Sequence, residues 1–195
     1  MTKELEIEFK NLLTREEYIN LLERFGYKEH DAVTQTNHYF DTTDYILRNQ
    51  KSALRIREKG QQMECTLKTP AENGYYEITD KLDPLQARDI IENRGFAASE
   101  VKEALAEMDV FPENLIRLGS LTTHRIEFPY KKGLLVLDHS EYHGTEDFEL
   151  EYEVEDYDTG KQIFKDLLDD AGIPARSTDK KIARFMSSAK NVKRT

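Results

Sequence analysis

The sequence predicts an α+β protein built on a closed eight-stranded antiparallel β-barrel, a tunnel with its helices packed outside. Three observations predict this fold. Eight segments are expected to form β-strands, and several of them alternate apolar and polar residues with the period of two that is typical of a strand. Several of them carry charge at every second position, and helical segments occur at both ends and in the middle of the chain. Eight antiparallel strands can close around side chains or one small ligand.

The opening segment, residues 6–10, illustrates the strand pattern. Extended backbone places Glu6, Glu8 and Lys10 on one face and the apolar residues between them on the other. One such strand is typical of any half-solvated sheet. Solvated strands usually mix Thr, Ser, Gln and Lys, so the recurrence of dense charge indicates that the charged faces line a polar channel. The spacing recurs at residues 55–57, 64–68, 125–127 and 149–153.

The first half of the chain then supplies a helix and four strands. The first strand is expected to end near Lys10, and Thr14 with Glu17 makes a capping box for a helix that ends at Gly26. The next four strands are expected at 34–41, 53–59, 62–69 and 74–79.

A helical insert is expected at about 83–110, between the two halves of the sheet. Asp83 followed by Pro84 is typical of the start of a helix, and Ser99 is expected to cap a second helix. Strands resume at about 121–128, 134–139 and 147–155.

The carboxyl-terminal segment is expected to be helical. Gly160 to Ala171 is interpreted as one helix closed by Gly172, and a last helix is expected to begin near Asp179. Together with the amino-terminal helix and the insert, these helices would cover the apolar face of the barrel.

Length and composition limit the other properties. The 195 residues suit a single domain over 1–195, and the net charge of −10 argues against nucleic-acid and membrane partners. No signal peptide and no membrane-spanning segment is evident. The single cysteine, Cys65, excludes an intrachain disulfide and fits a reducing compartment. We therefore expect a cytoplasmic protein, and the sequence leaves open whether it forms a homodimer.

The charged side chains of the channel indicate its ligand. Arg55 and Arg57 stand about 7 Å apart on one strand face, a spacing that suits neighbouring phosphates. Carboxylates would repel such an anion unless a hard cation, Mg²⁺ or Mn²⁺, came between them. The sequence therefore predicts phosphoryl transfer on a linear polyphosphate. The candidate phosphate ligands are Lys10, Arg55, Arg57, Lys68, Arg125, Lys181 and Arg184, and the candidate metal ligands are Glu6, Glu8, Glu149 and Glu151.

These residues resemble the motifs of the CYTH proteins, or triphosphate tunnel metalloenzymes, a family of class IV adenylate cyclases, thiamine triphosphatases and inorganic triphosphatases. Residues 6–10 are similar to the E-x-E-x-K signature, 53–57 to a second block and 65–68 to a third. The resemblance spans about residues 4–185. Further matches are Glu77, Arg125, Asp138, residues 148–151 and residues 181–184.

The resemblance implies a closed eight-stranded tunnel and hydrolysis of inorganic triphosphate or a related triphosphate with Mg²⁺ or Mn²⁺. The catalytic residues that it implies are Glu6, Glu8, Lys10, Lys68 and Glu77. The metal ligands that it implies are Glu6, Glu8, Asp138, Glu149 and Glu151. Two points stay open. The acidic pair that binds the metal is either Glu149 with Glu151 or Glu151 with Glu153. Glu77 and Asp138 could each ligate metal, orient a lysine or form a structural ion pair.

Two other functions remain as alternatives. A class IV-type adenylate cyclase would convert ATP to cyclic AMP and pyrophosphate, but no adenine pocket and no P-loop motif is evident. A non-catalytic module would bind polyphosphate or a nucleotide without turnover. The sequence also contains His139 and His143, four residues apart. They lack the order of the H-E-x-x-H zinc motif and are expected at a strand end, so we interpret them as surface histidines.

Overall fold

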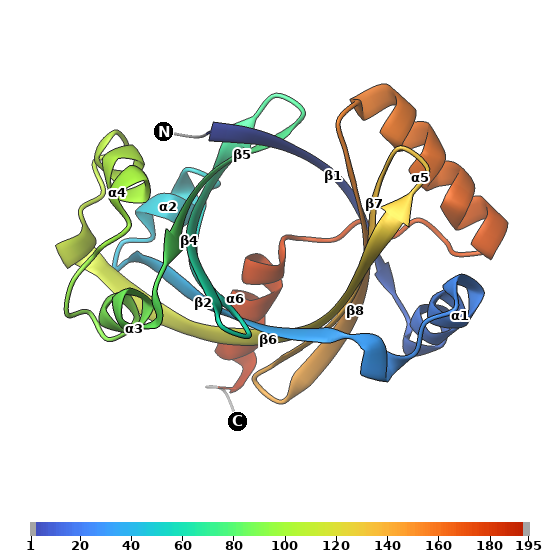
Figure 1. Ribbon diagram of the computed structural model, residues 1–195, viewed down its shortest axis with the longest axis horizontal. Helices are drawn as coiled ribbons and strands as arrows, with labels where there is room; N and C mark the ends of the chain where they lie inside the picture. Colours follow the sequence, from blue (N-terminus) through green and yellow to red (C-terminus); the bar gives the residue numbers. More distant parts are fainter. Residues whose placement is uncertain (1–2, 193–195) are drawn as a thin grey trace. The chain divides into compact units, whose positions relative to one another are not determined.

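The computed structural model describes residues 3–192, and its eight strands form a closed barrel in the order β1-β5-β4-β3-β2-β6-β7-β8 (Figure 1). This confirms the predicted fold class. The strands are β1 (Lys3–Leu13), β2 (Val33–Thr42), β3 (Ala53–Lys59), β4 (Gln62–Ala71), β5 (Gly74–Leu82), β6 (Leu115–Tyr130), β7 (Gly133–Tyr142) and β8 (Thr145–Val154).

Six α-helices and two short 3₁₀ helices connect and flank these strands. The α-helices are α1 (Arg15–Phe25), α2 (Ile46–Asn49), α3 (Pro84–Ile91), α4 (Ser99–Ala106), α5 (Tyr157–Ala171) and α6 (Lys181–Val192). The 3₁₀ helices are η1 (Glu29–Asp31) and η2 (Pro112–Asn114). None of the helices in the described part of the chain has both the length and the apolar composition that a membrane-spanning helix needs.

The chain packs as two compact units. Unit 1 comprises Met1–Leu5 and Gln35–Leu121, and unit 2 comprises Glu6–Thr34 and Thr122–Thr195. Each unit has its own hydrophobic core, in which the apolar face of its strands packs against helices.

In unit 1, strands β3, β4 and β5 form an antiparallel meander whose apolar face is covered by α3 and α4. Leu54, Ile56 and Leu67 are fully buried there, and Val101 and Leu105 of α4 complete the same core. Cys65 also lies in this core, and burial raises the pKa of its thiol. This agrees with the sequence, in which the cysteine occupies the apolar face of its strand.

In unit 2, α1 and α5 lie outside strands β7 and β8 (Figure 1). Tyr18 of α1 and Phe164 of α5 pack against Leu137, Leu150 and Tyr152 of the two strands. The alternate residues of β8 are buried as well, although they are acidic. This part of the sheet is therefore buried on both faces, and only one face is apolar.

The caps predicted for α1 and α3 are confirmed, whereas the cap predicted at Ser99 is wrong. The backbone N–H of Glu17 donates to Thr14 Oγ1 at 3.2 Å, and that of Thr14 donates to the Glu17 carboxylate at 2.8 Å. Gly26, with φ of +78°, ends α1 in the left-handed region that favours glycine. Asp83 accepts from two backbone N–H groups at the start of α3.

Helix α5 begins three residues earlier than predicted. Asp156 caps it by accepting from the Thr159 N–H at 2.8 Å, so Gly160 lies inside the helix and does not begin it. A Cβ at Gly160 would stand 2.5 Å from Val154 Cγ2 and 2.9 Å from Phe9. The glycine is therefore needed for close packing against β8 and β1, a role that its position in the sequence does not reveal.

Two other helices begin on carboxylates that do not occupy the cap position. Helix α4 begins at Ser99, which is not its cap, and the Val101 N–H donates to Asp80 of β5 at 2.9 Å. The short helix α2 was not predicted. Its Leu47 and Arg48 N–H groups donate to the buried carboxylate of Asp41, which lies at the end of β2. Local sequence gives no indication of either contact.

Several strands are longer than predicted, among them β1, β5, β6 and β7. Strand β1 continues past Lys10 to Leu13, because it stays paired with β8 as far as Leu13 and Phe148, and the Asn11 side chain accepts from the Arg176 N–H at 2.6 Å. Strand β6 begins at Leu115 instead of at about residue 121, and it continues through Gly119.

We predict that Asp41→Ala lowers the free energy of unfolding by about 1–3 kcal/mol, because three backbone N–H groups, two of them buried, lose their acceptor. Urea denaturation measures the effect. Asp44→Ala, a neighbouring exposed aspartate, is the matched control and should change stability by less than about 0.5 kcal/mol. Equal effects of the two substitutions would contradict a capping role for Asp41.

Candidate functional site

The predicted site residues fall into two sets, one in each unit. The set in unit 2 lies on strands β1, β6, β7 and β8 and on helix α6. It contains Glu6, Glu8, Lys10, Arg125, Asp138, Glu149, Glu151, Lys181 and Arg184. The set in unit 1 lies on strands β3, β4 and β5 and contains Arg55, Arg57, Lys68 and Glu77.

In unit 2, Arg125 is held by two acidic residues of neighbouring strands. The register pairs Arg125 of β6 with Asp138 of β7. The guanidinium binds both Asp138 oxygens, at 2.8 Å from Nε and 2.6 Å from Nη2, and Nη2 also donates to Glu151 at 2.8 Å. Asp138 is fully buried and Glu151 is 4% exposed. A bidentate buried pair of this kind fixes both side chains.

Helix α6 adds the central cation of the set. The ammonium of Lys181 lies 2.7 Å from Asp138, 2.7 Å from Glu149 and 2.5 Å from Glu151. An ammonium has three donors, and here each has a carboxylate. One turn later, Arg184 binds Glu149 at 3.0 Å.

The charges of these groups are stabilised although they are buried. Burial alone would raise the pKa of Asp138 and of Glu151, but Arg125 and Lys181 outweigh it and hold both pKa values below their usual range. Burial would lower the pKa of Lys181, but the three carboxylates outweigh it and raise that pKa. All of these groups therefore stay ionised near neutral pH.

Strand β1 brings more negative charge to β8. Their register pairs Glu8 with Glu153 and Lys10 with Glu151, and the Lys10 ammonium binds Glu8 at 2.7 Å. Burial raises the pKa of Glu153 to about 7; Arg125 opposes this, and the nearby charges of Glu6, Glu151 and Glu8 add to it. Carboxylates outnumber cations in this set, so its donors fit a hard divalent cation.

In unit 1, cations predominate. The Lys68 ammonium lies 2.8 Å from the Glu77 carboxylate, its cross-strand partner, and Arg55 lies 3.6 Å from the same group. Burial would raise the pKa of Glu77, but Arg55 and Lys68 outweigh it and lower that pKa. Arg57 donates to Asn37 at 3.0 Å. This arrangement presents fixed guanidinium and ammonium groups, which bind phosphate oxygens.

The structure adds residues that sequence reasoning did not select. Asp147 binds Arg184 at 2.8 Å and accepts from the Tyr142 hydroxyl, and Asn37 orients Arg57. Asp147 stands two residues before Glu149 on the same strand. The alternation that indicated Glu149 would therefore have found Asp147 too.

Comparison with known proteins identifies the family to which the sequence is similar. The family described as the CYTH domain matches residues 4–186. A Bacillus subtilis protein named "Putative triphosphatase YjbK" is 41% identical over 187 residues, which are 95% of this chain and 96% of the relative. The YjbK protein is therefore similar to this chain over nearly its entire length.

Two solved structures are also similar. A Bacillus halodurans protein described as a putative adenylate cyclase has a TM-score of 0.91 and 38% identity, covering 95% of this chain and 99% of that one. The Hippeastrum protein HpAC1 has a TM-score of 0.76 and 24% identity, covering 94% and 96%, and shows the shared fold. The resemblance seen in the sequence is confirmed, and the chain belongs to the CYTH domain family.

Proposed function

We propose that this protein hydrolyses a phosphoanhydride bond of inorganic triphosphate, or of a related triphosphate, with Mg²⁺ or Mn²⁺. The observation that carries the proposal is the sharing of Lys181 among Asp138, Glu149 and Glu151. If Lys181 turned to bind a phosphate, these buried carboxylates would lose the positive charge that they share. Burial of unpaired charge is costly, so a divalent cation has to replace the lost positive charge. The triphosphatase name of the relative from Bacillus subtilis agrees with this function.

Glu6, Glu8, Glu149 and Glu151 are the residues that we propose to hold the metal. Bound there, a divalent cation would polarise phosphate oxygens and lower the pKa of a water molecule. Between the two open alternatives, Glu149 is preferred to Glu153. Glu149 is fully buried and is one of the three carboxylates that bind Lys181. The Glu153 side chain is 30% exposed and lies 4.0 Å from the Arg125 guanidinium.

The remaining residues bind and orient the substrate. We propose that the phosphates are bound by Lys10, Arg55, Arg57, Lys68, Arg125, Lys181 and Arg184. These cations would also stabilise the charge that develops on the leaving phosphate. Glu77 positions Lys68 and Arg55, and Asp138 positions Arg125 and Lys181. The Arg125 guanidinium binds both oxygens of Asp138, and this supports a positioning role for Asp138.

Product analysis tests this function. The purified protein should release orthophosphate and pyrophosphate from inorganic triphosphate in the presence of Mg²⁺ or Mn²⁺, and a chelator should abolish the release. The same assay with ATP tests the cyclase alternative, which the description of the Bacillus halodurans relative suggests. Cyclic AMP as the main product would contradict the proposal, as would absence of triphosphate turnover with either metal.

Paired substitutions distinguish the two acidic residues of β8. Glu149→Gln should lower the metal-dependent turnover about 100-fold or more, because it removes a proposed ligand. Glu153→Gln, the matched control on the same strand face, should lower it less than about 10-fold. Turnover as a function of metal concentration measures both. A larger loss in Glu153→Gln would assign the metal to Glu151 and Glu153 instead.

A further inference from the structure

The opposite face of strands β6, β7 and β8 carries a second group of polar side chains that the proposed function does not use. Asp138 and Ser140 lie on the face of the ion-pair network, so His139 and Glu141 lie on the other face, beside α1. Glu146 of β8 is the cross-strand partner of Glu141, and His124 of β6 is the partner of His139. Two imidazoles and two carboxylates therefore meet on adjacent strands.

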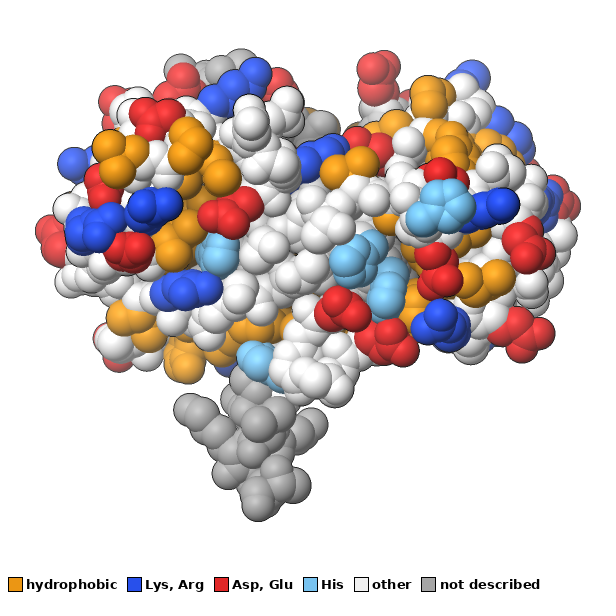
Figure 2. All heavy atoms as spheres, turned by 60° about the horizontal axis from the view of Figure 1, so that its bottom comes forward, with side chains coloured by type: hydrophobic (Ala, Val, Ile, Leu, Met, Phe, Trp, Pro, Cys, Tyr) orange, Lys and Arg blue, Asp and Glu red, His pale blue; other side chains and the backbone are white. Residues whose placement is uncertain are grey.

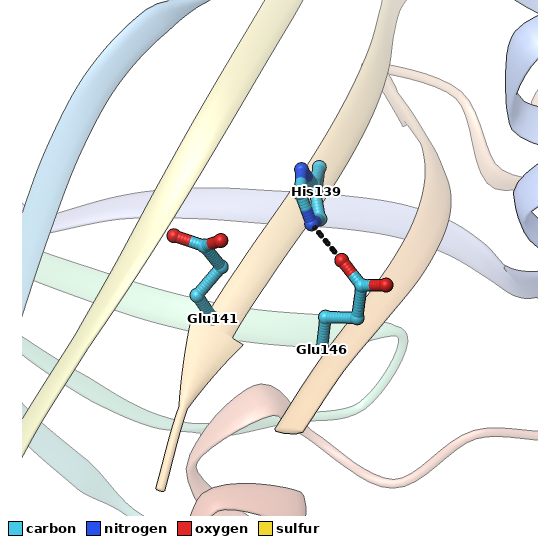
Figure 3. A group of neighbouring side chains, drawn as sticks. All are labelled: His139, Glu141 and Glu146. Carbon is cyan, nitrogen blue, oxygen red and sulfur yellow. Dashed lines mark hydrogen bonds and ion pairs between the residues drawn. The ribbon is translucent and has the colours of Figure 1, made fainter. Parts of the chain in front are cut away.

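The polar atoms of this group lie close together, in two hydrogen-bonded pairs. Figure 3 shows the Glu146 carboxylate bound to the His139 ring, with the Glu141 carboxylate beside them. His139 Nε2 lies 2.7 Å from Glu146 Oε2, and His124 Nε2 lies 3.3 Å from Glu141 Oε2. His139, Glu141 and Glu146 each contribute one potential ligand atom, and these three atoms lie within 4.8 Å of one another. Ligands of a tetrahedral zinc ion stand about 3.3 Å apart, so these three side chains would have to turn toward a common centre, and His124 would join them through its contact with Glu141.

Contacts outside the group fix both histidine rings. His139 stacks on Phe148, with ring centroids 4.6 Å apart, and its side chain is 15% exposed. His124 Nδ1 lies 3.0 Å from the Thr34 hydroxyl, which leaves Nε2 directed at the group. A hydrogen bond to the second ring nitrogen is the usual support of a metal-binding histidine. The rings are therefore oriented before any ion arrives.

The two carboxylates of the group supply negative charge for a cation and are exposed to solvent. The side chains of Glu141 and Glu146 are 54% and 48% exposed, and Figure 2 shows histidine side chains next to acidic ones at the molecular surface. Arg15 is the nearest cation, 4.0 Å from Glu146, but its side chain is 58% exposed and can turn away. Nothing in these contacts blocks the approach of a cation from solvent.

We propose that His124, His139, Glu141 and Glu146 form a binding site for Zn²⁺. Imidazole ligands favour zinc over magnesium, so the site differs in chemistry from the all-carboxylate set on the opposite face. A set of four protein ligands is typical of a structural zinc site. A bound ion would join β6, β7 and β8, the strands that carry Arg125, Asp138 and Glu149. His143 is not part of the site, because its ring stacks on Phe185 of α6.

Competition with a chromophoric zinc chelator tests this site on the full-length protein. The titration uses Zn²⁺ in saturating Mg²⁺, which occupies the oxygen ligands of the proposed active site. We expect one tightly bound equivalent of Zn²⁺, weakened about 10-fold or more by His139→Ala and by His124→Ala. His143→Ala is the matched control and should bind Zn²⁺ like the unmodified protein. Zinc should raise the melting temperature of the control but not that of His139→Ala.

Two further variants separate zinc binding at this site from a loss of folding and from zinc binding on the opposite face. Glu146→Gln changes an exposed residue and serves as the test if His139→Ala does not fold; it too should bind Zn²⁺ more weakly. Glu149→Gln, on the opposite face, should keep the zinc equivalent. Unchanged affinity in the His124 and His139 variants, or loss of the equivalent in Glu149→Gln alone, would overturn the proposal.

Discussion

The compensation of buried charge on β6, β7 and β8 is the constraint on which the rest of the structure depends. Asp138 and Glu149 are fully buried, and a buried carboxylate is tolerated only with a partner. Lys181 and Arg125 are those partners, and they come from a helix at the end of the chain and from a neighbouring strand. Strand register and the docking of α6 are therefore tied together by the same few ion pairs.

This constraint connects fold to chemistry. A cation that is already paired with carboxylates binds phosphate less strongly. We therefore expect an anionic substrate to bind together with a divalent cation. The strands can carry charge on one face because their other face is apolar and packs under α1 and α5. The histidine and glutamate side chains near the end of that apolar face follow from the same alternation, since His139 directly follows Asp138 in the chain.

Strand alternation explains how much of this could be predicted. A period of two indicated both faces of β1, β3, β4 and β8, and with them Glu8, Arg55, Lys68 and Glu151. Local sequence could not indicate that Asp80 caps α4, or that Gly160 permits close packing, because each of these depends on a distant residue. Register decides the partners across strands. The pairing of His124 with His139 was therefore missed, although both residues lie in predicted strands.

A double-mutant cycle on Arg125 and Asp138 tests the central claim most directly, through the free energy of unfolding of Arg125→Met, Asp138→Asn and the combined variant. Each single substitution should cost about 3–5 kcal/mol, because it leaves a buried charge without one of its partners. The combined variant should cost clearly less than the sum of the two. Small and additive losses would contradict the account, since they would mean that these buried charges do not depend on each other.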